Sequence, residues 1–463
     1  MSALMVQGTA SSAGKSLVTT ALARLLHRRG VDVVPFKAQN MSNNARVVDG
    51  GEIGTAQYLQ ALAAGVEPDV RMNPILVKPE GDNRSQVVVL GRPDLELSRL
   101  PWRARRGALW PVIEGALASL QAEHDFVLLE GAGSPAEINL RDTDLANMRT
   151  AKAAGARVIL VTDIDRGGAF ASLYGTWALL PADERALIDG FVLNKFRGDA
   201  TLLPPAPERL RDLTGVPTLG VLPWLRHALP DEDGAFVTQA KGRGPVVGVV
   251  RYPTASNLDE LKPLERVAQV RWITTPDALD GATFVVLPGS KHVAADLAWL
   301  RASGIADELV ASDTLLLGVC GGMQMLGERI DDRAGVDGDA EGLGLLPLRT
   351  VFHREKTTRP VEARFGAIEG PWRALSGALF RGYEIRHGAT TGTAPAVLPD
   401  GLGFASGRVL ALGAHGLFEQ TDVLTRLFGT AGDGSLEQAF DKLADAVERH
   451  LDLSAVLPLG VTA

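Results

Sequence analysis

A glycine-rich loop near the start of the chain is the first feature whose residues could do chemistry. It reads GTASSAGKS from Gly8, after an apolar run and before a helical pattern. In that setting the backbone N–H groups from Gly8 and Thr9 to Gly14 can hold phosphate oxygens. Lys15 would reach the β- and γ-phosphates, and Ser16 would bind Mg²⁺. Five residues separate the two glycines instead of the standard four, so a simple glycine turn before a helix is the alternative.

Polar residues follow several later apolar runs and are expected at one edge of a sheet, where open parallel α/β sheets bind ligands. They are Lys37, Glu130, Asp163, Asp165 and Asn194. A carboxylate facing a phosphate loop suits Mg²⁺, so we expect Glu130 to be a second metal ligand. A helix cap or a solvated loop acid is its alternative. Lys37 and Asn194 are expected to bind nucleotide, Asn194 at the adenine edge. Asp163 and Asp165 are weaker candidates for substrate binding.

The only cysteine of the chain, Cys320, stands at a second chemical site. It follows the apolar run at 315–319 and precedes two glycines and a helical pattern. This order is typical of a nucleophile elbow, in which a helix N-terminus lowers the pKa of the thiol. A free thiol, with a pKa of about 8.5, is mostly protonated at neutral pH and needs a base. A buried structural cysteine is the alternative, since one cysteine forms no internal disulfide.

His415 is the predicted base for this cysteine. It lies among small residues at the end of an apolar run, whereas three other histidines, at 27, 124 and 450, lie in charged helical contexts. Backbone N–H groups at Gly289 and Gly321 are expected to form an oxyanion hole, because glycine turns next to a nucleophile can point N–H groups at a developing negative charge.

Two sets of alternating strands and helices are expected to position these residues. The first set has helical patterns at 16–29 and 111–123, between apolar runs at 4–7, 31–36, 126–130, 157–162, 190–194 and 218–222. The second has apolar runs at 246–251, 267–273, 283–287 and 315–319, followed by a glycine-rich, β-like region at 343–412. Such alternation predicts an α/β protein with two doubly wound domains.

The predicted domains follow from the same patterns. We assign the phosphate-loop domain to 1–228 and the cysteine domain to 246–432. Residues 229–245 are rich in proline, glycine and charge, which indicates a linker. Residues 433–463 are expected to form a helical tail, with its helix at 436–451.

Composition limits the possible partners. The 463 residues include 47 basic and 55 acidic side chains, a net charge of −8, and 46% are hydrophobic. This is typical of a folded globular protein, and it argues against a nucleic acid or an anionic membrane as partner. No basic stretch precedes the first apolar run, so we expect no secretory signal and a cytoplasmic location. An anionic ligand needs local cations, for which Lys37, Lys78 and Arg84 are candidates.

Longer strings around these residues resemble known families. The phosphate loop resembles that of dethiobiotin-synthetase-like ATPases, and the surroundings of Cys320 and His415 resemble class I glutamine amidotransferases. Over nearly the whole chain, five strings are similar to those of the cobyric acid synthase family. They are FKAQNM at 36–41, GGEIG at 50–54, MNP at 72–74, EGAGSPAEINL at 130–140 and DIDRGG at 163–168.

The resemblance implies ATP- and glutamine-dependent amidation of the b, d, e and g carboxylates of adenosylcobyrinic acid a,c-diamide in cobalamin biosynthesis. It implies Cys320 as nucleophile, His415 as base, and ATP with Mg²⁺ but no tightly bound organic cofactor, since the corrin is substrate. Ala38 stands where proline is common and Arg386 where histidine is frequent. Leu417 stands where many class I glutaminases carry the acid that orients the histidine, so the group that orients His415 is left open.

Two other functions remain open at this point. Cobyrinic acid a,c-diamide synthases join similar domains, although the strings at 39–41 and 134–140 favour the cobyric acid synthase family. Partitioning ATPases that are not amidating enzymes also carry deviant phosphate loops, but they have no need of Cys320.

Overall fold

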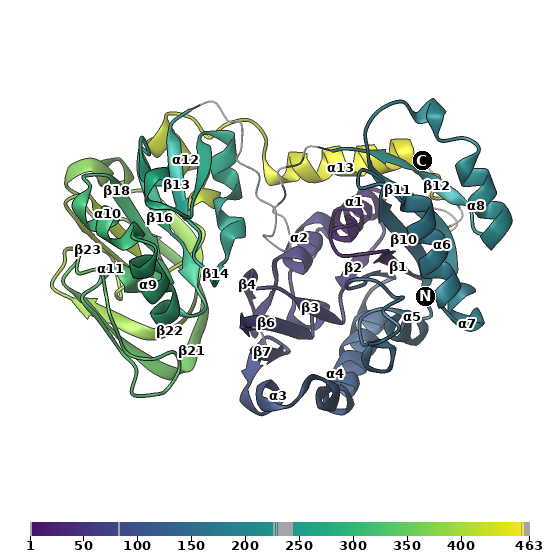
Figure 1. Cartoon of the computed structure of the whole chain (residues 1–463), viewed down its shortest axis with the longest axis horizontal. Coiled ribbons are helices and arrows are strands. Elements are labelled where there is room, and N and C mark those ends of the chain that lie inside the picture. Colours follow the sequence, from purple (N-terminus) through teal and green to yellow (C-terminus); the bar gives the residue numbers. More distant parts are fainter. Residues whose placement is uncertain are drawn as a thin grey trace.

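The chain forms two α/β lobes that lie side by side in the computed structural model (Figure 1). The first lobe contains the phosphate loop and the second contains Cys320. The structure describes residues 2–81, 84–225, 227, 229, 244–454, 456 and 457.

Six parallel strands form the central sheet of the first lobe, in the order β12-β11-β10-β1-β9-β2. They are β1 (Ser2–Gly8), β2 (Val33–Phe36), β9 (Phe126–Glu130), β10 (Arg157–Asp163), β11 (Ile188–Phe196) and β12 (Thr218–Pro223). Alternate residues of one strand enter two different cores, as Met5 and Val6 do. Both faces are therefore covered, which explains why these strands are continuous apolar runs and confirms the doubly wound prediction.

Helices on the two faces bury the sheet. One face packs against α4 (Trp102–Glu123), α5 (Met148–Ala154), α6 (Ala169–Leu179) and α8 (Ala206–Thr214), with the short α7 (Ala182–Arg185) beyond α6. The other face packs against α1 (Lys15–Arg28), α2 (Thr55–Ala64) and α13 (Leu436–His450). The predicted helix at 111–123 was too short, because Pro111 lies inside α4 instead of at its start.

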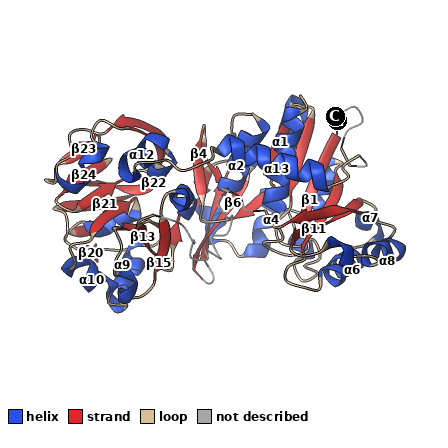
Figure 2. Ribbon diagram, turned by 90° about the horizontal axis from the view of Figure 1, so that it is seen from above, coloured by secondary structure: helices blue, strands red, loops and turns tan. Residues whose placement is uncertain are grey.

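An excursion between β2 and β9 was not predicted. It contains β3 (Gln39–Met41), β4 (Ala45–Val48), β5 (Gly51–Gly54), β6 (Ile75–Gly81), β7 (Arg84–Val89), β8 (Arg92–Asp94) and α3 (Leu95–Arg99). These strands form a hairpin, β4-β5, and a small sheet, β3-β6-β7-β8. The excursion lies between the central sheet of the first lobe and the second lobe (Figure 2), and β4 packs against two strands of that lobe.

The second lobe has a seven-stranded sheet in the order β15-β13-β16-β18-β25-β24-β23, parallel except at β24 and β23. Its strands are β13 (Val246–Val250), β15 (Gln269–Ile273), β16 (Phe284–Leu287), β18 (Leu315–Val319), β23 (Ala396–Leu398), β24 (Gly403–Ser406) and β25 (Val409–Leu412). A second sheet contains the long pair β21 (Leu348–Arg364) and β22 (Leu379–Gly392). The helices are α9 (Val293–Ala302), α10 (Ile305–Ala311), α11 (Gly321–Leu326) and α12 (Thr421–Phe428).

The terminal helix α13 returns to the first lobe, where it packs along α1 (Figure 1). Arg24 contacts Asp441 at 2.8 Å, and Arg29 contacts Glu448 at 2.6 Å. The predicted linker at 229–245 lies outside the described residues apart from 229, 244 and 245. Within the described part of the chain, no helix combines the length and apolar character needed to cross a bilayer.

Candidate active site

The phosphate loop joins β1 to α1, and neighbouring strands hold it from both sides. Gly14 precedes α1 with φ at 101°, a left-handed conformation that favours glycine. A Cβ there would lie 2.0 Å from Asn194 Nδ2, and Asn194 donates to the Ala13 carbonyl at 2.9 Å. On the other side the Thr9 and Thr162 hydroxyls are 2.9 Å apart. The structure therefore brings Thr9, Gly14 and Asn194 together around one loop.

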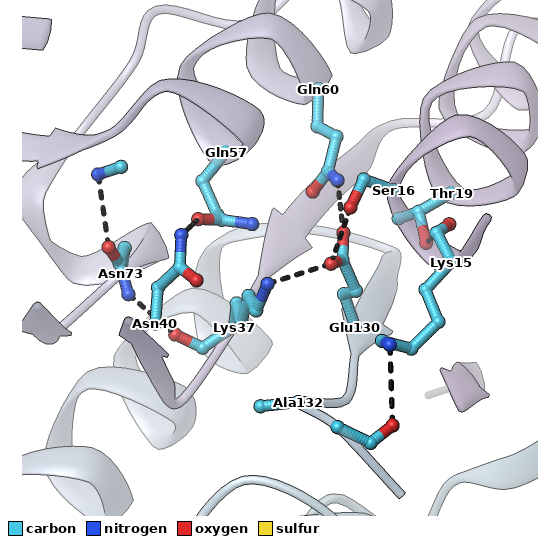
Figure 3. A network of polar contacts seen from close by, with 12 residues as sticks. Lys15, Ser16, Thr19, Lys37, Asn40, Gln57, Gln60, Asn73, Glu130 and Ala132 are labelled. Atoms are coloured by element: carbon cyan, nitrogen blue, oxygen red, sulfur yellow. Dashed lines mark hydrogen bonds and ion pairs between the residues drawn. The ribbon is translucent and has the colours of Figure 1, made fainter. Parts of the chain in front are cut away.

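Glu130 is the centre of a buried polar cluster beside this loop (Figure 3). Its Oε1 accepts hydrogen bonds from Ser16 Oγ at 2.9 Å and from Lys37 Nζ at 2.8 Å, and its Oε2 accepts from Gln60 Nε2 at 2.5 Å. Glu130 is fully buried, so it is neither a solvated loop acid nor an exposed helix cap. Lys15 lies nearby and donates to the Gly133 carbonyl at 3.3 Å. Sequence reasoning did not find Gln60, which comes from α2.

The residues expected to hold Mg²⁺ fit that ion chemically. A serine hydroxyl and a carboxylate are hard oxygen donors, and Mg²⁺ usually takes one or two protein ligands and completes its shell with phosphate and water. Ser16 and Glu130 are already in contact, so one ion could reach both. Within the described residues, no group of three or more His, Cys, Asp or Glu side chains could hold a metal by itself.

Asp163 and Asp165 lie at the rim of the same loop. Lys195 Nζ donates to Asp163 Oδ2 at 3.0 Å and to the Ser12 carbonyl of the loop at 2.7 Å. Asp165 is exposed and pairs with Arg197 at 3.3 Å. Lys195 therefore links Asp163 to the phosphate loop, whereas Asp165 lies farther toward solvent.

Cys320 occupies the predicted elbow between β18 and α11. Its φ of 53° and ψ of −107° are unusual for a residue with a side chain, and such strain is found where a structure holds a reactive group in place. The following glycines are sterically required, since a Cβ on Gly322 would lie 1.9 Å from the Leu287 carbonyl oxygen. A Cβ on Gly321 would lie 2.7 Å from the Ser290 nitrogen.

His415 lies beside Cys320, and a carboxylate that was not predicted holds its other side. Glu260 Oε1 is 2.6 Å from His415 Nδ1, and Glu260 Oε2 accepts from the Gly416 N–H at 2.7 Å. Glu260 belongs to the 3₁₀ segment η4 (Leu258–Arg266) and is buried. The predicted oxyanion glycine Gly289 is close as well, because a Cβ there would lie 2.9 Å from His415 Cε1.

The electrostatics of this cluster favour an imidazolium and a thiolate. Burial acts to lower the pKa of His415, but Glu260 and Cys320 outweigh it and raise that pKa to about 10. Burial acts to raise the pKa of the Cys320 thiol, but His415, Arg386 and the Gly321 N–H outweigh it and lower that pKa. These contacts therefore favour the thiolate of Cys320 more than the surroundings of a free cysteine would.

Comparison with known proteins decides the family. Residues 4–232 match the CobQ/CobB/MinD/ParA nucleotide binding domain, and residues 246–423 match the CobB/CobQ-like glutamine amidotransferase domain. The chain is 56% identical to the cobyric acid synthase of Variovorax paradoxus, over 97% of each chain. It is 53% identical to that of Polaromonas sp. strain JS666, over 99% of this chain and 98% of the other. The chain belongs to the cobyric acid synthase family.

In this member of the cobyric acid synthase family, a cavity between the lobes reaches the thiol. The second lobe contributes Cys320 and His415 to its lining, and the first lobe contributes Asn43 and Lys78. Lys78 is buried and contacts Glu52, which also accepts from Lys356 of the second lobe at 2.6 Å. Lys78, predicted as a cation for an anionic ligand, thus lines the same cavity as the cysteine.

The predicted site residues of this family member therefore gather at two places. The phosphate loop, Lys37, Glu130 and Asn194 form one group, and Cys320, His415 and the two oxyanion glycines form the other. The side chain of Arg84 lies outside the described part of the structure. Glu260 and Gln60 had no signal in their spacing, since Glu260 is 155 positions from His415 and Gln60 is 70 positions from Glu130.

Proposed function

We propose that this chain amidates the b, d, e and g carboxylates of adenosylcobyrinic acid a,c-diamide, with glutamine as nitrogen donor and one ATP consumed per amide. One observation carries the proposal: a phosphate loop beside a buried carboxylate and a thiol paired with an imidazole occur in one chain, on two lobes that both line one cavity. The chain's similarity to the cobyric acid synthases of Polaromonas sp. strain JS666 and Variovorax paradoxus supports the reaction class.

The first lobe would activate the carboxylate, which is a poor electrophile as it stands. The loop N–H groups and Lys15 would hold the ATP phosphates at the start of α1. Ser16 and Glu130 would hold Mg²⁺, which supplies neutralisation of charge on the phosphoryl oxygens. An oxygen of the substrate carboxylate would attack the γ-phosphorus, so that ADP leaves and an acyl phosphate forms. Lys37 would hold Glu130 in position throughout, through their 2.8 Å ion pair.

The second lobe would release ammonia from glutamine. The Cys320 thiolate would attack the amide carbonyl, and backbone N–H groups at Gly289 and Gly321 would stabilise the oxyanion. The His415 imidazolium would then protonate the leaving nitrogen, and water would hydrolyse the thioester to glutamate. Neutral ammonia would attack the acyl phosphate and expel phosphate. Ammonia released in bulk water is mostly protonated at neutral pH, so release close to its target gives a large advantage.

The test is an assay with two corrin substrates. The protein is incubated with Mg²⁺, ATP and glutamine, together with either adenosylcobyrinic acid a,c-diamide or cobyrinic acid, and mass spectrometry counts the amides formed. We expect four amidations of the first substrate. If only cobyrinic acid is amidated, and at its a and c carboxylates, the protein is a diamide synthase instead. ATP hydrolysis without any amide product would favour a partitioning-type ATPase.

A further inference from the structure

Arg46 of the first lobe reaches into the second lobe at the two segments that carry His415 and its carboxylate. It lies on β4 and is buried. Its Nη2 is 2.5 Å from Asp259 Oδ2, and its Nη1 forms an ion pair with Glu419 Oε1. Asp259 is adjacent to Glu260 in the sequence, and Glu419 closes the short segment η7 (Leu417–Glu419) that begins two residues after His415. One guanidinium therefore ties both segments together.

Other groups of the first lobe contact the same region. Thr55 Oγ1 donates to Asp259 Oδ2 at 3.2 Å, and the Leu258 N–H donates to Asn44 Oδ1 at 3.2 Å. Asn257 Nδ2 donates to the Ala45 carbonyl at 3.1 Å. The segment that carries Glu260 is thus held by the excursion of the first lobe along several consecutive residues.

The imidazole itself is packed by a ring that Arg46 also touches. The Tyr383 ring stacks on His415, with centroids 5.3 Å apart and an interplanar angle of 19°. The Arg46 guanidinium lies over the same tyrosine ring, 5.2 Å from its centroid. Asn257 donates to the Tyr383 hydroxyl at 3.0 Å, which links the ring to the same held segment.

Loss of the guanidinium would leave a buried negative charge beside the reacting groups. The Asp259 side chain has no solvent exposure, and its neighbour Glu260 is also a buried acid. A buried carboxylate without a cationic partner is strongly unfavourable, so the segment would shift to expose or repair it. Such a shift would move Glu260, whose two oxygens hold His415 and Gly416.

We propose that Arg46 is a positioning residue of the glutaminase reaction, supplied by the first lobe. It holds Asp259 and Glu419 so that Glu260 keeps the His415 imidazole directed at Cys320. The glutaminase site is thus complete only when the two lobes are in contact. The inference rests on the proposed roles of Cys320 and His415 and adds a residue that the second lobe alone does not contain.

The test uses the full chain and its only cysteine as a reporter. Because no other thiol is present, the rate of alkylation by iodoacetamide at neutral pH measures thiolate at Cys320 alone. We expect R46M to slow alkylation and to lower kcat/KM for glutamine by about 10-fold or more, mainly through kcat. Amidation supported by added ammonia should stay near the wild-type rate.

Two further variants separate positioning from a general loss of structure. R46K should be intermediate, since a lysine cannot make both contacts of the guanidinium fork. In R46M/D259N the fully buried charge of Asp259 is removed, whereas Glu419, whose side chain is 34% exposed, keeps its charge without Arg46, so alkylation and kcat should recover part of the way toward wild type. Arg24→Met is the matched control, because Arg24 also pairs with two carboxylates, Glu437 and Asp441, but these lie on α13 and not on a segment that carries Cys320, His415 or Glu260. It should leave both rates unchanged.

The outcomes are distinct. A wild-type alkylation rate and kcat in R46M would overturn the proposal. Faster alkylation would also overturn it. The first lobe helps to line the cavity of the thiol, so faster alkylation would show that Arg46 only holds the lobes together and thereby limits access to Cys320. The failure of the underlying glutaminase assignment would look different: Cys320→Ala would then retain glutamine hydrolysis, whatever R46M does.

Discussion

The two sites of the molecule differ in where their parts come from. Three side chains that donate to Glu130 belong to the first lobe: Ser16 lies on α1, Lys37 directly follows β2, and Gln60 lies on α2. The thiol site is assembled from farther apart. Its cysteine and histidine belong to the second lobe, but the segment of Glu260 is tied down by Arg46 of the first.

This difference predicts which of the two half-reactions depends on contact between the lobes. A phosphate site in which Ser16, Lys37 and Gln60 of the same lobe hold Glu130 is expected to form without the second lobe. A thiol site held from outside its own lobe is complete only in the joined molecule. Glutamine hydrolysis should therefore be the half-reaction that is sensitive to changes in the other lobe, and carboxylate activation the one that is not.

Removal of the Cys320 thiol should have the largest effect, and only on amidation with glutamine as nitrogen source. Cys320→Ala should lower glutamine-dependent amidation by a factor on the order of 10⁵, as removal of a catalytic nucleophile does, and leave ammonia-dependent amidation intact. Rates with glutamine and with ammonium chloride at the same pH measure the split. Cys320→Ser serves as the conservative comparison. Equal loss with both nitrogen sources would contradict the division of labour between the lobes.

A substitution in the phosphate loop should instead lower amidation with both nitrogen sources. Lys15→Met removes a cation aimed at the ATP phosphates, so amidation should fall about 10³-fold with either nitrogen source. Glutaminase activity measured without corrin should be close to wild type. Lys152→Met is a suitable control, since Lys152 is a lysine of the same lobe whose ion pair with Asp183 is on the surface. Activity with ammonia that survives in Lys15→Met would refute the assignment of the loop.

The same contrast explains what could be predicted from the sequence. The central strands of both lobes are continuous apolar runs because both faces of each sheet are buried, so the fold class and most strands were correct. The phosphate loop and the elbow are local motifs in which glycines stand next to the reactive residue. Their turns depend on a few consecutive residues, as the left-handed φ of Gly14 shows. The steric requirement for Gly14 and Gly322 comes instead from distant residues, Asn194 and Leu287, and could not be predicted from the motifs alone.

The missed parts are those that depend on contacts between distant segments. The strand Gln39–Met41 of the excursion is short and partly polar. The longer strands β6 and β7 are apolar over only three consecutive residues each, so they lack the extended apolar runs that identified the central strands. They are stabilised by packing between the lobes, which no local pattern records. Glu260 and Arg46 have no fixed spacing to His415. Only the folded structure brings Glu260 and Arg46 close to His415.

The smallest expected effect concerns Glu260, whose charge lies beside Cys320 and His415, and it tests most directly how the thiol site is held. Glu260→Gln keeps the size of the side chain but removes the negative charge that helps to raise the pKa of His415. That pKa should fall, so less imidazolium is present to stabilise the thiolate, and the pKa of Cys320 should rise. The acid limb of kcat/KM for glutamine should therefore move to higher pH, with a loss of about 10²-fold at neutral pH that shrinks as the pH increases.

The pH profile distinguishes this charge effect from damage to the fold, which would lower the rate equally at every pH. Iodoacetamide alkylation of Cys320 across the same pH range should show the same displacement. Glu437→Gln, which removes a surface partner of Arg24, is the control and should leave the profile unchanged. Ammonia-dependent amidation should also be unaffected, because Glu260 contacts the thiol site and not Glu130. An unshifted acid limb in Glu260→Gln would mean that His415 is held by its packing against Tyr383 alone, and the thiol site would then depend less on the first lobe than its contacts indicate.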